Sequence, residues 1–228
     1  MIVLGIDASS DAAAVGIVAD GVLLCEYTLN NGKNHSVKLL PMVEAVLLKT
    51  GITFPEIDAY ACGVGPGSFT GVRIGVATIK GFAQSYQKPV VPISSLQILA
   101  ENISEYSGLR VPCVHARCDE LYCAAYNRAG EAVLSPSVMT ATELLQYLGD
   151  KPCMLCGDGT ELLDGLGEQA AIAGKNAGVI RGGAVAELGY QLLLKEKQKH
   201  YSEVAPVYLR ASQAEREYEA RQNGQIIK

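Results

Sequence analysis

Charged side chains are scarce in this sequence. Only 19% of the 228 residues are Asp, Glu, Lys or Arg, and 49% are hydrophobic, whereas soluble domains average about 25% charged residues. Positive charge is especially short: 19 Lys and Arg stand against 24 Asp and Glu, so the net charge is −5. Because nucleic-acid binding rests on clustered Lys and Arg, the composition predicts that this chain does not hold nucleic acid without a partner.

The start of the sequence lacks a targeting segment. No basic residue precedes the apolar stretch 2–6, and Asp7 and Asp11 interrupt it before it could serve as a signal peptide or a membrane span. We therefore expect a cytoplasmic protein without membrane contact. A chain of this length buries roughly 70% of its unfolded surface, so it needs neither a disulfide nor a metal to fold.

Metal-binding patterns are also missing. The histidines His35, His115 and His200 form neither H-x-x-x-H nor H-E-x-x-H, so each is expected to be a surface or cap residue. The seven cysteines are odd in number and lie mostly in apolar runs, which favours reduced core residues over disulfides. Cys153 and Cys156 have the C-x-x-C spacing, for which a buried strand is favoured and metal or redox chemistry is the alternative.

The hydrophobic pattern predicts an α/β chain that repeats itself. Three strands, a helix, a strand and a helix occur twice, more faintly the second time, which indicates two similar lobes. We expect residues 1–104 to form the first lobe, joined by a C-terminal helix within 211–228, and residues 105–210 to form the second. Strands are expected at 2–6, 13–19, 22–29, 59–64, 89–93, 111–116, 121–126, 132–138 and 153–156, and helices at 36–50, 71–86, after Ser94, after Thr140 and at 211–221.

Several local signals support these elements. Asp20-Gly21 predicts a hairpin turn, and Gly51 a helix C-terminus, while Pro41 should kink its helix or lie in the first turn. Capping boxes are expected where Ser94 precedes Gln97 and where Thr140 precedes Glu143.

Two polar segments of the first lobe are candidates for ligand binding. Asp7 ends the first strand and is followed by Ser9 and Ser10, so its carboxylate could orient a metal-bound nucleotide or a nucleophile; a capped turn is the structural alternative. The second segment, a turn that contains Gly65, Gly67 and Ser68, lies between a strand and a helix and could hold an anion. It matches no dinucleotide, P-loop or nucleophile-elbow template, and a tight turn for close helix packing is equally favoured.

The helices 36–50 and 71–86 are apolar over most of their circumference, so each must be buried on more than one side. A central position in the core would explain this, but two such helices in a small lobe favour contact with another chain. The expected partner contacts are Leu39, Met42, Val43, Val46, Val72, Gly75, Val76, Ile79, Phe82 and Ala83.

Three stretches in the first half carry a specific pattern. They read Ile6-Asp7-Ala8-Ser9-Ser10, Asn34-His35-Ser36 with Leu39-Leu40-Pro41-Met42, and Gly63-Val64-Gly65-Pro66-Gly67-Ser68-Phe69-Thr70-Gly71-Val72-Arg73-Ile74-Gly75. They resemble the TsaB (YeaZ) family of the bacterial pathway that makes threonylcarbamoyladenosine in tRNA. Weaker likeness continues in Ala116-Arg117, Glu120-Leu121-Tyr122, Gly157-Asp158-Gly159 and Pro206-Val207-Tyr208-Leu209-Arg210, whereas His115 replaces an Asp that relatives usually carry.

The resemblance implies a two-lobed, actin-like (ribonuclease H-like) α/β fold of the ASKHA type, in agreement with the duplication. It implies a non-catalytic subunit needed to form threonylcarbamoyladenosine (t6A) next to the anticodon of tRNAs that read codons beginning with A. The implied partners are the paralogous transferase TsaD and, with it, TsaE, and tRNA would be reached through the complex. No resident cofactor or metal is implied, and weak nucleotide binding stays open.

TsaD-like chains carry two metal-binding histidines where this sequence has Ser95 and Leu99, and neither residue can supply an imidazole. The alternatives to an accessory subunit are an independent actin-like ATPase or kinase that uses Asp7 and the glycine turn, and a metallopeptidase, against which the missing histidine pair counts strongly. Alone, the chain is expected to form a homodimer through its two apolar helices. Replacing Val76 or Ile79 with Glu or Arg should abolish self-association and TsaD binding without unfolding the chain.

Overall fold

The computed structural model describes residues 1–32 and 34–210. The C-terminal helix expected within 211–228 lies outside the described residues. In the first half, the strands are β1 (Ile2–Asp7), β2 (Ala12–Ala19), β3 (Val22–Asn30), β4 (Ala59–Gly63) and β5 (Val90–Ile93), and the helices are α1 (His35–Thr50), α2 (Phe69–Tyr86) and α3 (Ser95–Glu101). In the second half, they are β6 (Leu109–Arg117), β7 (Glu120–Tyr126), β8 (Ala132–Thr140), β9 (Cys153–Cys156) and β10 (Ala170–Ile172), with α4 (Ala141–Leu148) and α5 (Gly182–Leu194). Short 3₁₀ turns follow at Phe54–Glu56, Asp158–Leu162, Lys175–Gly178 and Tyr201–Glu203.

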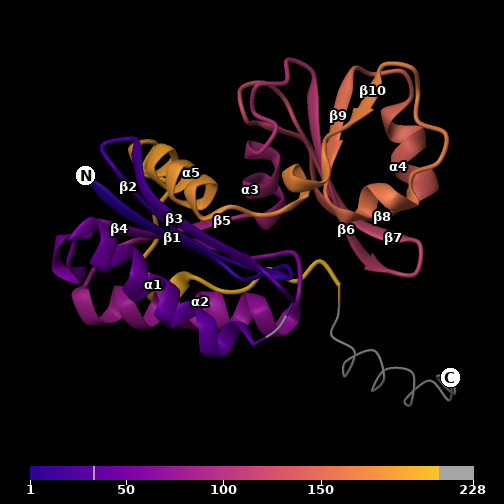
Figure 1. The fold of residues 1–228 in the computed structure, drawn as a ribbon. Coiled ribbons are helices and arrows are strands. Elements are labelled where there is room, and N and C mark those ends of the chain that lie inside the picture. The colour runs from indigo at the N-terminus through magenta and orange to yellow at the C-terminus, as the bar shows by residue number, and fades with distance from the viewer. Residues whose placement is uncertain (33, 211–228) are drawn as a thin grey trace, which may run out of the picture.

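Each half forms a five-stranded sheet, and the two sheets have the same topology. Their strand orders are β3-β2-β1-β4-β5 and β8-β7-β6-β9-β10. In both, the first strand pairs antiparallel with the second and parallel with the fourth. The predicted duplication is therefore confirmed, and the fold is the two-lobed, actin-like arrangement that the sequence suggested (Figure 1).

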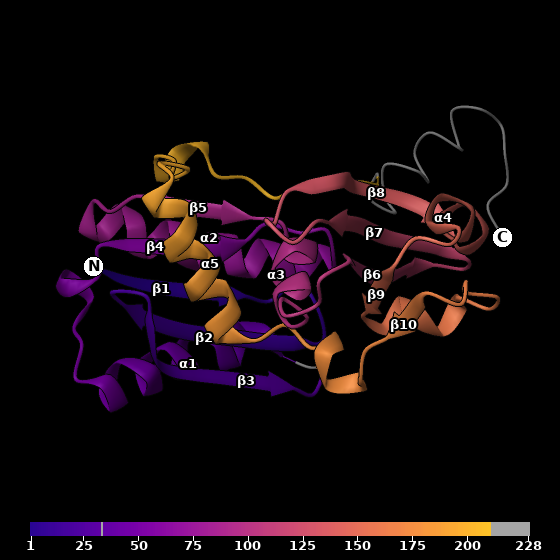
Figure 2. The same cartoon turned by 90° about the horizontal axis from the view of Figure 1, so that it is seen from above.

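The two halves exchange their last helices. In the first lobe, α1 and α2 cover one face of the sheet, while α5, from the end of the second half, covers the opposite face (Figures 1 and 2). In the same way, α3 ends the first half but packs on β6 and β7 of the second sheet. Although α5 belongs to the range 105–210 that was expected to form the second lobe, its apolar residues pack into the core on the face of the first sheet opposite α1 and α2 (Figure 1).

Most local signals are confirmed. Asp20 and Gly21 both have positive φ, at 49° and 81°, which gives the predicted tight hairpin. Gly51 ends α1 at φ 71°. Pro41 lies inside α1 beyond its first turn.

The two predicted capping boxes have different outcomes. At α4 the box is complete, since Glu143 N donates to Thr140 Oγ1 and the Glu143 carboxylate accepts from Thr140 N. At α3 the prediction is wrong, because the Ser94 side chain makes no capping hydrogen bond.

Candidate functional site

The Asp7 carboxylate is enclosed by its own chain. Asp7 is fully buried at the end of β1; its Oδ1 accepts hydrogen bonds from the amide and the hydroxyl of Ser9, both at 2.8 Å, and its Oδ2 accepts from Ser95 Oγ at 2.9 Å. A side chain at Gly63 would collide with the Asp7 carboxylate. Burial raises the pKa of Asp7, and the hydrogen bonds from Ser9 and Ser95 oppose that rise. The carboxylate thus ties β1 to the start of α3.

The glycine-rich turn closes over this network. Its Ser68 N donates to the Ser9 carbonyl at 2.7 Å, and Gly65 N donates to Ser95 Oγ at 3.2 Å. A Cβ at Gly67 would meet the same Ser9 carbonyl, and one at Gly71 would meet the carbonyl of Ala8. The glycines allow α2 to begin directly against the β1–β2 turn. The backbone amides of Ser68 and Gly65 already have hydrogen-bond acceptors within the chain.

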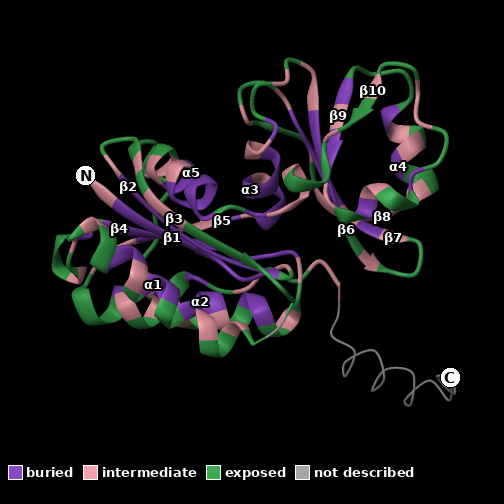
Figure 3. Ribbon diagram, in the orientation of Figure 1, coloured by how far each residue is buried: buried purple, intermediate pink, exposed green. Residues whose placement is uncertain are grey.

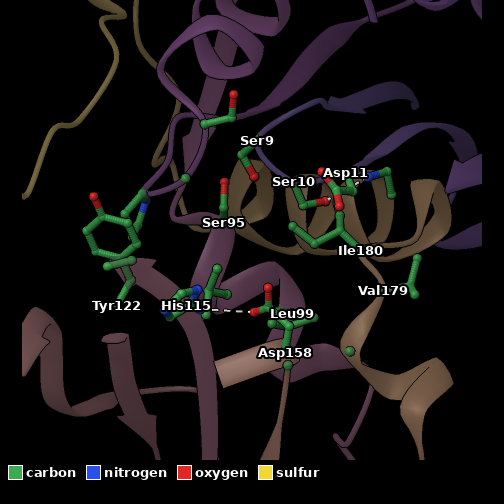
Figure 4. Close-up of a pocket in the computed structure, with 18 of the residues that line it drawn as sticks. Ser9, Ser10, Asp11, Ser95, Leu99, His115, Tyr122, Asp158, Val179 and Ile180 are labelled. Atoms are coloured by element: carbon green, nitrogen blue, oxygen red, sulfur yellow. Dashed lines mark hydrogen bonds between the residues drawn. The ribbon is translucent and has the colours of Figure 1, made fainter. Parts of the chain in front are cut away.

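A cleft of about 1170 Å³ separates the lobes (Figure 4). Ser9, Ser10, Gly67 and Ser68 line it, but Asp7 and Gly65 do not. The predicted candidates therefore divide into four residues at the cleft and two behind it. The floor of the cleft includes Leu99, Val114, Val179 and Ile180, and its acids are Asp11, Asp158 and Glu161.

The three histidines make local contacts. His115 lines the cleft; its amide donates to Asp158 Oδ1 at 3.0 Å and its Nε2 lies 2.8 Å from the Cys118 carbonyl. His35 opens α1 with Nε2 3.0 Å from the Ser10 carbonyl, and His200 caps the last 3₁₀ turn. Among the described residues, no group of three or more His, Cys, Asp or Glu is placed to hold a metal ion.

The C-x-x-C pair lies in strand β9, as the favoured interpretation predicted. Cys153 and Cys156 are both buried and free. Burial raises the pKa of Cys156 to about 12, so its thiol stays protonated at neutral pH and is a poor nucleophile.

The predicted partner contacts need correction. Nine of the ten are buried in the chain itself: Leu39, Met42, Val43, Val46, Val72, Gly75, Val76, Ile79 and Ala83. Phe82 is partly buried against the same core. These side chains face the first sheet, so a partner cannot reach them while the lobe is folded. Gly75 approaches the Ala8 side chain, so this glycine of α2 serves packing within the chain.

The opposite sides of α1 and α2 are exposed (Figure 3). On α1, the exposed apolar side chains Val37 (69%), Leu40 (48%) and Leu48 (82%) share one side of the helix. On α2 the exposed side includes Ala77 and Gly81, and a Cβ placed at Gly81 would meet no atom within 4 Å among the described residues, apart from the helix's own backbone. We call these five residues the outer face of α1 and α2.

A segment that we call the strap, residues 204–210, follows the last 3₁₀ turn and crosses α2. Val204 is buried and its carbonyl accepts from Lys80 Nζ at 2.9 Å, while Val207 N donates to the Val64 carbonyl at 2.8 Å. At its end, Arg210 forms an ion pair with Glu120 of β7 at 2.6 Å. The strap therefore connects the two lobes. No helix or strand periodicity marks this segment, because it is neither helix nor strand.

Two sheets of matching topology, exchanged helices and an interlobe cleft define a two-lobed, actin-like α/β protein. In the described residues, no helix is long and apolar enough to cross a membrane. The family model "TsaD: tRNA N6-adenosine threonylcarbamoyltransferase" matches residues 23–218.

Individual proteins similar to this chain indicate its family more narrowly than the family model does. The chain is 30% identical over 223 residues to the "tRNA threonylcarbamoyladenosine biosynthesis protein TsaB" of Escherichia coli (strain K12), with coverage of 92% of this chain and 95% of that protein. It is 31% identical over 228 residues to the protein of the same name in Bacillus subtilis (strain 168), with coverage of 94% and 96%. A Pseudomonas aeruginosa crystal structure, described as "an uncharacterized protein with similarity to peptidase YEAZ", matches with a TM-score of 0.80 at 28% identity, over 92% of this chain and 99% of that one. The chain belongs to the TsaB (YeaZ) family.

Proposed function

We propose that this chain is a non-catalytic subunit in the biosynthesis of threonylcarbamoyladenosine in tRNA. Its relatives of similar length are named for that pathway, and the matching family model is described as a transferase. In this proposal the chain binds a TsaD-type transferase and, together with TsaE, supports formation of the modification next to the anticodon of tRNAs that read codons beginning with A.

The buried Asp7 network supports an accessory role. The carboxylate expected to orient a metal-bound nucleotide makes all its hydrogen bonds to Ser9 and Ser95 and does not line the cleft. Ser95 and Leu99, which stand where TsaD-like chains carry metal-binding histidines, are themselves buried, and Ser95 is hydrogen-bonded to Asp7. Neither the Asp7 carboxylate nor these two residues are therefore in place to hold a metal-bound nucleotide in the cleft.

The outer face of α1 and α2 is the contact surface in this proposal. Val37, Leu40 and Leu48 expose apolar surface that the lone chain leaves in water, at a cost that a partner would remove. Ala77 and Gly81 would let the backbone of a partner approach α2 closely. In the absence of TsaD, the same face would pair with its own copy in a homodimer.

The test is capture of purified TsaD by the tagged chain, with Leu48→Glu and Gly81→Glu as variants and Glu44→Gln as the control. Glu44 is exposed on α1, and its replacement adds no charge to the contact. We expect both Glu variants to lose TsaD and to sediment as monomers with unchanged circular dichroism, while the control retains both interactions. Undiminished TsaD capture by both Glu variants would contradict this surface.

An independent actin-like ATPase or kinase is the alternative function, and titration calorimetry with Mg-ATP separates the two. The proposal predicts weak or no binding by the isolated chain. A dissociation constant in the low micromolar range would favour the alternative, because a dedicated nucleotide enzyme binds its cosubstrate near that level.

A further inference from the structure

One mouth of the cleft gathers three arginines and three aromatic rings. Arg73 and Phe69 come from the start of α2, Arg117 and Tyr122 from β6 and β7, and Arg210 from the strap; all five line the cleft. The sixth is Tyr208 of the strap, whose ring stacks on that of Phe69 with centroids 4.3 Å apart and planes inclined by 5°. These six residues are called the cleft mouth below.

The chain holds the central arginine in a fixed position. Arg73 Nε donates to the Tyr208 hydroxyl at 2.7 Å, and its guanidinium carbon lies 5.6 Å from the Phe69 ring centroid and 5.5 Å from that of Tyr208. Only Nε is used in this bond, and Arg73 is exposed, so its two terminal nitrogens have no hydrogen-bond partner among the described residues. A guanidinium held in this way loses little entropy when it binds a phosphate.

The charge of the cleft mouth differs from that of the whole chain. The charged residues that line the cleft are four cations, Arg73, Arg117, Lys175 and Arg210, and three acids, Asp11, Asp158 and Glu161. One positive charge remains in excess locally, although the chain as a whole carries −5. Arg117 is exposed and has no ion-pair partner among residues 1–32 and 34–210. The acids of the cleft come from the β1–β2 turn and from the 3₁₀ turn after β9, and Asp158 accepts a hydrogen bond from His115 N of β6 (Figure 4).

We infer that the cleft mouth binds unpaired nucleotides of RNA. Arginine side chains beside exposed aromatic rings are the combination that holds single-stranded nucleic acid, because bases stack on the rings and the guanidinium groups contact the phosphates. Of the three rings, Tyr208 is 41% exposed and is the one on which a base would stack, whereas Phe69 and Tyr122 are partly buried. The excess of a single charge predicts modest affinity and strong dependence on salt.

This inference goes beyond the proposed function and assigns a direct RNA contact to a chain whose net charge favoured contact through a partner only. It concerns the isolated chain, and although Arg73 lies one helical turn from Ala77 of the outer face, the residues that test RNA binding, Arg117 and Tyr208, lie on β6 and the strap. RNA binding can therefore fail while TsaD capture succeeds, and the reverse.

The experiment measures fluorescence anisotropy of a labelled single-stranded RNA of about twelve nucleotides with the full chain at low salt. We expect saturable binding. Replacing Arg117 with Ala should weaken binding about fivefold and reduce the slope of log K against log salt by about 0.7, the contribution of one phosphate contact to a single strand. Tyr208→Ala should weaken it about tenfold through lost stacking, and Tyr208→Phe should retain most of the affinity.

Arg128→Ala is the matched control, because Arg128 is an exposed arginine that follows β7, at the end of the strand away from Glu120. It should bind RNA as the unaltered chain does. Circular dichroism of every variant checks the fold. The inference is overturned if the RNA does not bind, or if Arg117→Ala and Arg128→Ala lose the same affinity. Duplex RNA that binds as tightly as the single strand would also overturn it. So would competition from ATP at matched concentration, which would indicate a mononucleotide site.

Discussion

Asp7 has no access to solvent, although it lies at the end of a strand, a position where a carboxylate suggests a catalytic site. Its partners explain its presence: Ser9 follows in the same turn, and Ser95 reaches it from 88 residues away. The sequence could single out Asp7 because an acid ends an apolar strand. It could not show Ser95 beside it, because nothing local relates the two residues, and so the ligand role could not be separated from the structural one.

The raised pKa of Asp7 leads to a pH-dependent prediction. An Asp with a raised native pKa binds a proton more tightly in the native state than in the unfolded state. Its contribution to stability therefore falls as the pH rises from about 4, the ordinary value for Asp, through the raised native pKa. Asp7→Asn has no such titration and keeps an oxygen for Ser9.

Urea unfolding at several pH values tests this. We expect the native chain to lose stability relative to Asp7→Asn as the pH rises through that window, by at most about 1.4 kcal/mol per pH unit. A constant difference between the two proteins would contradict the assignment. TsaD capture should be the same for both.

At the scale of elements, α1 and α2 show what periodicity can and cannot determine. The apolar pattern located both helices to within two residues. It could not say which side faces the sheet, because both helices are apolar over most of their circumference. The interface prediction accordingly took Val76 and Ile79, which pack beneath the sheet, and passed over Ala77 and Gly81, which do not. Which side of each helix faces the sheet depends on where the neighbouring strands lie in the folded chain.

Two adjacent residues of α2 test this assignment. Val76 is 4% exposed and Ala77 is exposed. Val76→Glu should lower the free energy of unfolding by more than about 2 kcal/mol, because it buries a charge without a partner. Ala77→Glu should change it by no more than about 0.5 kcal/mol. Chemical denaturation of the pair measures both values, and equal destabilisation would show that both sides of α2 are buried.

For the whole molecule, the duplication followed from the repeated order of elements, but the exchange of helices did not. The sequence of a helix does not show which of two sheets it will cover when both sheets present an apolar face. Here α5 enters the first lobe because Gly182 and Gly5 let it lie close over β2 and β1. Thr28 Oγ1 and the Glu26 carboxylate on β3 then accept from the first amides of the helix, at 3.3 Å and 2.7 Å.

The exchange predicts that neither half folds alone. A fragment of residues 1–107 lacks α5, and one of 108–228 lacks α3, so each would expose an apolar sheet face. We expect each fragment expressed separately to be insoluble or unfolded by circular dichroism, and co-expression of the two to restore a folded complex. A cooperative unfolding transition for fragment 1–107 alone would contradict the expectation.

The position of α5 also bears on synthesis. The last strand of the amino-terminal sheet, β5, ends at Ile93, but the helix that covers its second face ends at Leu194. At about 5 to 20 residues per second, the ribosome needs on the order of 5 to 20 s to make the intervening stretch. During that interval, one apolar face of the first sheet is exposed to solvent, so chaperones can bind the nascent chain there. The amino-terminal lobe is completed only near the end of translation.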